Sequence, residues 1–292
     1  MANGIIIVDK PSGWTSQDVA AKLRGVFHER RVGHGGTLDP MATGVLPVFV
    51  GRATRAAEFM ESAEKEYVAG LRLGLVTNTQ DTSGETLAEH PVSVTKEALE
   101  RVFRQFTGPM EQLPPMYSAI KIGGKKLYEL ARKGQEVERQ PPPVTIHELE
   151  LLDGAGSDWT LRVRCSKGTY VRTLCHDIGA ALGCGGCMSA LRRTAAGGFT
   201  LRQAVTMQQI LDFAAENDPQ ALLMPVDALF SRHPALIVTI GQAARIRNGA
   251  DVRDRSFPDG TFRVYAEDGN FLMLGRSEGG TLSVIKNFFE VT

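Results

Sequence analysis

The sequence predicts an α+β fold: a mixed, largely antiparallel sheet with packed helices, followed by a small β-barrel. Apolar residues alternate with others along residues 67–75, which is typical of a strand that buries one face. Such strands alternate irregularly with helical patterns such as residues 96–106. The sequence pattern changes near residues 225–234, and short predicted strands follow. We therefore expect one domain over residues 1–230 and a second over residues 231–292.

The amino-terminal elements are predicted from caps and apolar patterns. Residues 4–8 read as a buried strand, and Thr15 or Ser16 can cap the helix that follows. The apolar face of that helix comprises Val19, Leu23, Val26 and Phe27. Residues 45–50 are continuously apolar, as in a buried strand. Residues 96–106 form a helix whose inward side chains are Leu99, Val102, Phe103 and Phe106.

The carboxy-terminal half of the large domain continues the alternation. A strand at residues 144–152 changes its apolar phase, which indicates a bulge or bend. Residues 159–165 alternate again, and Thr169 opens a helix. The segment between Pro114–Pro115 and the three prolines at residues 141–143 is basic, and we expect a loop with a short helix there. Thr206 and Gln209 have capping-box spacing at the start of another helix.

The small domain is predicted from four short strands with a hairpin turn at residues 268–270. These strands cover residues 236–240, 261–266, 271–274 and 281–285.

Composition places the chain among soluble globular proteins. Its 292 residues are 42% hydrophobic and 23% charged, and no apolar run approaches the roughly 20 residues that span a bilayer. The start of the chain carries neither a basic region nor a cleavage site, so we expect a cytoplasmic protein. The net charge is zero, which argues mildly against nucleic-acid binding, although a basic cleft can coexist with an acidic opposite face.

Cysteine usage indicates a reduced compartment. Cys184 and Cys187 form a CxxC, but Cys165 and Cys175 lie ten residues apart and do not complete a metal-ligand set. We interpret all four as small buried apolar residues. No phosphate-binding glycine loop, dinucleotide fingerprint or metal cluster is present, so we expect no cofactor and no metal.

The most informative stretch is residues 32–55, where Asp39 lies on a glycine-rich turn before a buried strand. Gly33, Gly35 and Gly36 allow a sharp turn and the close approach of a bulky substrate. A carboxylate fixed in this way can serve as a nucleophile or base. A plain turn or capping role is the alternative that the spacing alone leaves open.

The whole string closely resembles the signature of the TruB-type tRNA pseudouridine synthases, bacterial stand-alone type. Further blocks in the same order resemble that family at residues 8–16, 64–85, 112–134, 165–183 and 191–193. The resemblance implies the pseudouridine synthase fold, with a PUA-like RNA-binding barrel at the end. It implies a tRNA pseudouridine(55) synthase that isomerises uridine in the T-loop. Lys10 and Pro11 match its first motif, where their role is structural.

The resemblance also assigns roles around the reaction. Asp39 is implied as the catalytic residue, and Arg172 as the guanidinium that holds it by paired hydrogen bonds. Tyr67 is implied to stack on the uracil and to help move the C5 proton. Leu191 is implied to shield the site from water.

Other positions are implied to bind RNA. The target uridine must be flipped out of its loop, and His34 matches the residue that takes its place. Asp81 matches a residue that contacts the extruded RNA. Lys121 and Lys125 are expected to touch phosphates. The expected partner is the T-arm of tRNA, without a membrane or an obligatory protein partner, and the expected state is a monomer.

Three alternatives stay open from the sequence. The chain could be the catalytic subunit of a guide-RNA-dependent pseudouridylation particle, or a non-enzymatic RNA-binding or RNA-folding module. A carboxylate glycosidase would need a second acid near Asp39, for which Glu64 and Glu66 are candidates.

Overall fold

The main sheet organises most of the chain. The structure is a computed structural model that describes residues 2–60 and 62–289. The strands of the main sheet are β1 (Gly4–Lys10), β2 (Val32–His34), β3 (Thr43–Val50), β4 (Lys65–Leu73), β7 (Gly108–Glu111), β10 (Pro143–Ala155), β11 (Asp158–Cys165), β12 (Gly186–Ala196), β13 (Phe199–Thr200) and β14 (Val205–Thr206). Their order is β14-β1-β3-β12-β4-β11-β10-β7, with β2 added to β3 and β13 to β12. Most pairs are antiparallel, as predicted, while β1–β14 and β3–β12 are parallel.

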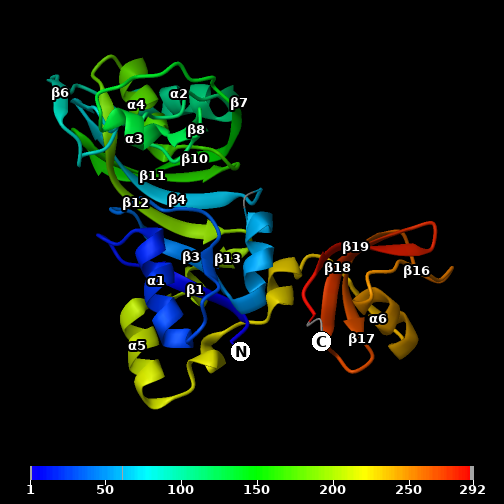
Figure 1. Ribbon diagram of the computed structural model, residues 1–292. Helices are drawn as coiled ribbons and strands as arrows, with labels where there is room; N and C mark the ends of the chain where they lie inside the picture. Colours follow the sequence, from blue (N-terminus) through cyan, green and yellow to red (C-terminus); the bar gives the residue numbers. More distant parts are fainter. Residues whose placement is uncertain (1, 61, 290–292) are drawn as a thin grey trace.

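Helices cover the two halves of this sheet separately. The α-helices of this part are α1 (Ser16–Phe27), α2 (Lys96–Phe106), α3 (Leu127–Ala131), α4 (Val171–Ala181) and α5 (Met207–Glu216). Short 3-10 helices are η1 (Gly51–Met60), η2 (Leu201–Gln203), η3 (Pro219–Leu222) and η4 (Val226–Phe230). In Figure 1, α1 and α5 lie beside β1, whereas α2 and α4 lie at the other end with β10 and β11.

Most predicted elements are confirmed, and their ends follow local chemistry. Thr15 caps α1 in a reciprocal capping box with Asp18, and α2 has the predicted bounds. The predicted bulge in β10 falls between Ile146 and Glu148. The strand predicted over residues 67–75 instead ends at Leu73, because Gly74 turns the chain with φ +82°.

The two halves of the sheet meet along a narrow seam. β12 pairs with β3 at two positions, Arg192 with Thr43 and Arg193 with Gly44. Gly44 has φ +99°, and a Cβ there would lie 2.2 Å from the carbonyl oxygen of Arg193. This glycine therefore allows both a left-handed turn and the close approach of the two strands.

Two small hairpins extend from the main sheet. β5 (Leu75–Thr77) pairs with β6 (Thr86–Glu89), and β8 (Lys121–Ile122) pairs with β9 (Lys125–Lys126). The second hairpin and α3 are the loop and short helix predicted between the proline clusters.

A separate five-stranded sheet forms near the carboxy terminus (Figure 1). It consists of β15 (Ala235–Val238), β16 (Val252–Arg253), β17 (Gly260–Ala266), β18 (Phe271–Glu278) and β19 (Thr281–Asn287) in the order β15-β17-β18-β19-β16. The predicted hairpin turn joins β17 to β18. The sequence prediction missed α6 (Ile240–Arg247), whose first residue it had placed at the end of a strand.

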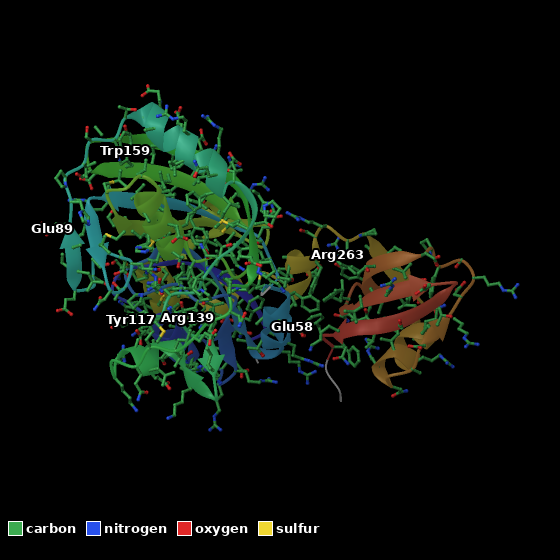
Figure 2. All side chains as sticks on the ribbon, turned by 90° about the horizontal axis from the view of Figure 1, so that it is seen from above. Glu58, Glu89, Tyr117, Arg139, Trp159 and Arg263 are labelled. Carbon is green, nitrogen blue, oxygen red and sulfur yellow. The ribbon has the colours of Figure 1, made fainter. Side chains whose placement is uncertain are left out.

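Aromatic packing joins the two sheets. Phe59 on η1 contacts Phe230 edge-on, with ring centroids 5.0 Å apart, and Phe230 also contacts Phe271 and Phe288. An ion pair joins Lys286 to Glu58 on η1. Figure 2 shows Glu58 on the side of η1 that faces the carboxy-terminal part. The two parts thus share one apolar cluster.

Within residues 2–60 and 62–289, no helix is both long and apolar enough to cross a membrane.

Candidate active site

Asp39 lies on the turn between β2 and β3. Gly36 on this turn has φ +92°, and a Cβ on Gly35 would lie 2.6 Å from Met60 Cγ. The turn thus requires these two glycines, whereas a Cβ on Gly33 would make only an ordinary contact, 4.0 Å from Thr54 Cγ2. The Asp39 side chain keeps 36% of its surface exposed, so a substrate can reach it.

Arg172 on α4 holds Asp39 with two prongs. Its Nε lies 3.0 Å from Oδ2 of Asp39, and its Nη2 donates to Oδ1 at 3.4 Å. The rest of the guanidinium is anchored by backbone, since Nη1 donates to Thr79 O at 3.2 Å and Nη2 to Tyr117 O at 2.8 Å. The predicted pairing of Asp39 with Arg172 is therefore present, and Arg172 is 6% exposed.

Asp81 is a second carboxylate near Arg172. Its Oδ2 lies 3.8 Å from Arg172 Nη1. Its Oδ1 accepts hydrogen bonds from the Thr79 hydroxyl, the Ser83 hydroxyl and the Ser83 backbone. Asp81 is buried, so in this conformation it supports Arg172. A contact of Asp81 with RNA stays a prediction and requires the carboxylate to become exposed.

Opposing influences act on the pKa of Asp39. Burial raises this pKa above its usual value, while the positive charge of Arg172 lowers it. Asp81 raises the pKa and Lys10 lowers it, by smaller amounts. Without Arg172 this partly buried carboxyl would be harder to ionise.

Lys10 supports the same turn from β1. Its side chain is fully buried, and Nζ donates to the carbonyls of Pro11, Trp14 and Pro40 at 2.9, 2.6 and 3.1 Å. Burial lowers the pKa of Lys10 to about 8, against the attraction of Asp39. The ammonium group thus ties the Lys10–Pro11 segment to the residue after Asp39, which agrees with the structural role expected for Lys10 and Pro11.

Tyr67 and Leu191 come from the adjacent strands β4 and β12. Both are buried: Leu191 pairs with Ala69, and Tyr67 pairs with Arg193. Burial raises the pKa of Tyr67, and the nearby charge of Arg193 lowers it. The charge of Asp39 also raises this pKa, by a smaller amount.

Arg193 was missed as a site residue by sequence reasoning. It is 1% exposed, and its guanidinium donates to Val45 O, Gly36 O and Thr37 O. It therefore binds the turn that carries Asp39. Its only signal in the sequence was its place in the block at residues 191–193.

The predicted RNA-contacting residues differ in their burial. His34 ends β2 and is half-buried, and its Nδ1 is buried without a hydrogen-bond partner. Burial and the charge of Arg193 lower the pKa of His34, which favours the neutral ring. Lys121 and Lys125 are exposed on the β8–β9 hairpin.

Glu64 and Glu66 do not join Asp39. Glu64 pairs with Arg164 and His147, and Glu66 accepts a hydrogen bond from Thr194. Because Glu66 precedes Tyr67 on β4, its side chain points to the opposite face of the sheet. The paired carboxylates of a glycosidase are therefore not built from these residues.

In the described part of the chain, no group of three or more His, Cys, Asp or Glu side chains could hold a metal ion. The four cysteines are free and buried, and burial raises the pKa of Cys187 to about 11. A thiol with such a pKa is a poor nucleophile at neutral pH.

Comparisons with protein families match nearly the whole chain. Residues 24–171 match the model of the TruB family pseudouridylate synthase N-terminal domain. Residues 172–231 match the model of the tRNA pseudouridylate synthase B C-terminal domain. Residues 234–285 match the model described as pseudouridine synthase II TruB, C-terminal.

Relatives from several bacteria carry the name tRNA pseudouridine synthase B. One from Azoarcus sp. (strain BH72) is 47% identical over 97% of this chain and 93% of its own length. One from Pseudomonas aeruginosa is 44% identical over 94% and 91% of the two chains. One from Clostridium kluyveri is 38% identical over 98% and 99%.

Solved structures share the fold. A structure of an H/ACA RNP bound to a substrate RNA containing 2′-deoxyuridine matches with a TM-score of 0.76 and 25% identity, over 99% of this chain and 86% of the other. A crystal structure of a Cbf5-Nop10-Gar1 complex matches with a TM-score of 0.75 and 27% identity, over 99% and 85%.

Proposed function

Because this chain belongs to the TruB family of pseudouridylate synthases, we propose that it isomerises uridine to pseudouridine in tRNA, at position 55 of the T-loop. The observation that carries this proposal is the two-pronged pair of Asp39 and Arg172 on the turn that resembles the family signature. The names of relatives at 38–47% identity support the same reaction.

The reaction breaks the N1–C1′ bond of uridine, rotates the uracil and forms a C5–C1′ bond, after which C5 loses its proton. Oxidation state does not change, so no redox partner is needed. The ionised Asp39 acts on the ribose, either as nucleophile at C1′ or as base for a ribose proton. Both routes require the carboxylate form, and Arg172 favours that form.

The buried strand residues assist the reacting base. Tyr67 stacks on the uracil and helps to move the C5 proton, and Leu191 keeps water from the site. Their buried positions on the adjacent strands β4 and β12 support these roles. A site closed to water also protects the detached uracil.

Residues outside this centre bind the RNA. His34, half-buried at the end of β2 just before the Asp39 turn, enters the loop from which the target base is flipped. Lys121 and Lys125 bind phosphates from the exposed hairpin. The T-arm of tRNA is the proposed ligand of this surface.

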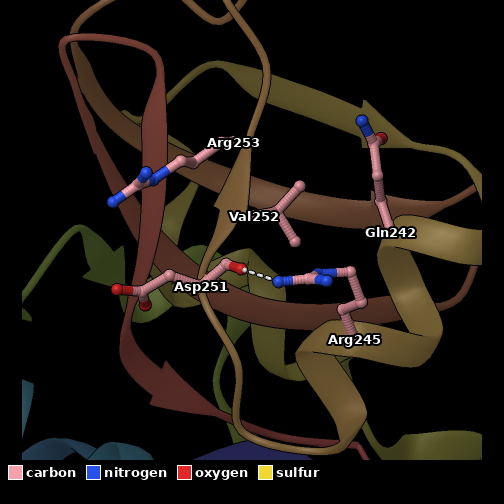
Figure 3. A pocket seen from close by; sticks show the side chains of 5 residues that line it. All are labelled: Gln242, Arg245, Asp251, Val252 and Arg253. Carbon is pink, nitrogen blue, oxygen red and sulfur yellow. Dashed lines mark hydrogen bonds between the residues drawn. The ribbon is translucent and has the colours of Figure 1, made fainter.

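The carboxy-terminal part is proposed as a PUA-like RNA-binding domain over residues 231–292, following a catalytic domain over residues 1–230. A hollow of about 560 Å³ lies between α6 and β16. Figure 3 shows the residues that line it. Gln242 and Arg245 line it from α6, and Arg253 lines it from β16. Arg245 donates to Asp251 O at 3.3 Å (Figure 3). These guanidinium groups suit phosphates of a part of the tRNA remote from the target loop.

The proposed enzyme works alone, as a cytoplasmic monomer without metal or cofactor. Its likeness to the H/ACA structures favours one competing function, the catalytic subunit of a guide-RNA-dependent particle. The name tRNA pseudouridine synthase B, which the bacterial relatives carry, favours the present proposal. An assay with protein and tRNA alone distinguishes the two.

The deciding experiment incubates the full chain with an unmodified tRNA transcript and maps pseudouridine at nucleotide resolution. We expect pseudouridine at position 55, and none with Asp39→Asn. Modification that requires a guide RNA, or tRNA binding without any modification, would reject the proposal.

A further inference from the structure

The first turn of α4, which carries Arg172, is held from outside the helix. Its N-cap residue is Tyr170, which makes no side-chain capping hydrogen bond. Serine, threonine, aspartate or asparagine would ordinarily supply this bond. Two glutamine side chains from other segments contact the turn instead.

Gln112, just after β7, binds the backbone of Tyr170 with both ends of its amide. Nε2 of Gln112 donates to Tyr170 O at 3.1 Å, and the Tyr170 N–H donates to Oε1 at 2.8 Å. Gln112 is 1% exposed. A buried amide with both ends bound to one residue fixes that residue in position and rotation.

Gln80, between β5 and β6, contacts the same turn from another side. Its Oε1 accepts a hydrogen bond from the Thr173 hydroxyl at 2.9 Å. Its backbone is left-handed, with φ +63°, and its carbonyl accepts from Met188 N on β12. A non-glycine residue keeps such a conformation only where its surroundings enforce it, and such residues cluster at active sites.

The same two segments also orient the guanidinium of Arg172. Thr79 O, next to Gln80, accepts from Nη1, and Tyr117 O, on the segment that Gln112 begins, accepts from Nη2. The segments that carry Gln80 and Gln112 thus bind both the first turn of α4 and the side chain of Arg172. A shift of either segment would move the Arg172 guanidinium that faces Asp39.

We propose that Gln112 and Gln80 are positioning residues, which fix the first turn of α4 so that Arg172 meets Asp39 with both prongs. This proposal rests on the proposed function, in which Asp39 acts in its ionised form. Neither residue needs to touch RNA for this role.

A positioning role for Gln112 and Gln80 predicts a change in the pH dependence of the rate, which a loss of stability alone does not. The charged groups that act on the Asp39 carboxyl are Arg172 from α4, Asp81 from the β5–β6 connection and Lys10 from β1. The phenols of Tyr67 and Tyr170 also lie within its influence. A displaced Arg172 lowers the pKa of Asp39 less, so the pH below which activity is lost moves upward.

The test uses the full chain with Gln112→Met, which keeps the volume and removes both hydrogen bonds. Thr173→Val removes the contact with Gln80 and is an independent second variant. Ile7→Val, in the cluster around η1, is the control for lowered stability away from α4. Single-turnover rates at saturating enzyme are measured on a tRNA transcript across pH, together with the tRNA dissociation constant and thermal unfolding.

We expect each glutamine-contact variant to lose rate by about 10- to 100-fold, as displacements near 1 Å can do. The acidic limb of its pH–rate profile should move to higher pH, with tRNA affinity unchanged. The Ile7→Val profile should coincide with wild type. Wild-type rates, or slower rates with an unmoved limb, in both folded variants would overturn the positioning role. An inactive wild type would instead reject the proposed function itself.

Discussion

At Asp39, burial and an opposite charge act against each other on one carboxyl group. Burial raises the pKa and Arg172 lowers it, and burial is the larger influence. An ionised Asp39 therefore costs folding free energy that a neutral side chain would not. The placement of Asp39 thus serves the reaction and lowers the free energy of unfolding.

Asp39→Asn should fold, bind tRNA and form no pseudouridine. The amide is neutral, so the desolvation cost of the carboxylate disappears and offsets the lost ion pair with Arg172. We expect the variant to stay folded, because Arg172 keeps the carbonyls of Thr79 and Tyr117 as hydrogen-bond acceptors. Denaturant unfolding, a filter-binding assay and a single-turnover assay check the three expectations. Near-wild-type turnover by this variant would contradict the catalytic role of Asp39.

Arg172→Lys should lose far more rate than affinity. Lysine keeps the charge but cannot contact both oxygens of Asp39 and two carbonyls with one planar fork. We expect a rate loss of about 100-fold or more, as for other misaligned catalytic groups. Arg164→Lys, an exposed arginine paired with Glu64, is the matched control. Equal modest losses of rate and affinity would instead indicate a phosphate contact for Arg172.

The wild-type rate should fall as the pH decreases. The ionised form of Asp39 is active, so activity is present above its pKa and is lost as the pH falls through it. Because burial raises that pKa, the loss should begin at a higher pH than for an exposed aspartate. Single-turnover rates across pH test this, with tRNA binding measured at each pH. A flat profile down to the usual aspartate range would contradict it.

At the scale of elements, local chemistry made much of the fold predictable. The bounds of α2 and the start of α1 follow from apolar periodicity and from threonine caps. The helix α6 was missed although Thr239 and Gln242 form a capping box, because it has only eight residues and few buried positions. Short elements carry too few periodic residues to outweigh a strand-like neighbourhood.

The site was less predictable than the elements. The Asp39–Arg172 pair joins residues 133 positions apart, and it was expected from family resemblance only. Arg193 could not be recognised as a support of the turn, because its acceptors are backbone carbonyls. Every residue type has a carbonyl group, so such acceptors leave no pattern in a sequence.

The β8–β9 hairpin should contribute affinity and not chemistry. Lys121→Ala with Lys125→Ala should weaken tRNA binding and lower the slope of log affinity against log salt by about 1.4–1.8, the value for two phosphate contacts. The rate at saturating enzyme should be unchanged. Binding at several salt concentrations tests this, with Lys96→Ala on α2, paired with Glu100, as the control. An unchanged salt slope would remove these lysines from the RNA interface.

Over the whole molecule, the two sheets pack against each other through one shared apolar cluster. The predicted division near residue 230 follows the sheets, but Phe230 contacts aromatic rings from both parts. A chain cut after residue 235 would expose Phe59 and Phe230 to water. We therefore expect such a shortened chain to be less stable, while the residues around Asp39 remain present.

The intact chain should unfold in one cooperative transition. Phe230→Ala should cost about 3–5 kcal/mol, the usual loss for a buried phenylalanine, and should separate the unfolding of the two sheets. Calorimetry measures the number of transitions. Leu87→Ala, on the exposed β6 strand, is the control and should change little. Two transitions in the wild type would show that the shared cluster does not couple the parts.

The wide separation of Asp39 and Arg172 in the sequence also delays the formation of their ion pair during synthesis. The ribosome completes the turn with Asp39 first and must add 133 residues before Arg172 exists. At about 5–20 residues per second, this interval is roughly 7–27 s. Throughout it, the turn lacks the guanidinium that orients its carboxylate. A nascent chain therefore cannot complete its reactive pair until the start of α4 has been synthesised.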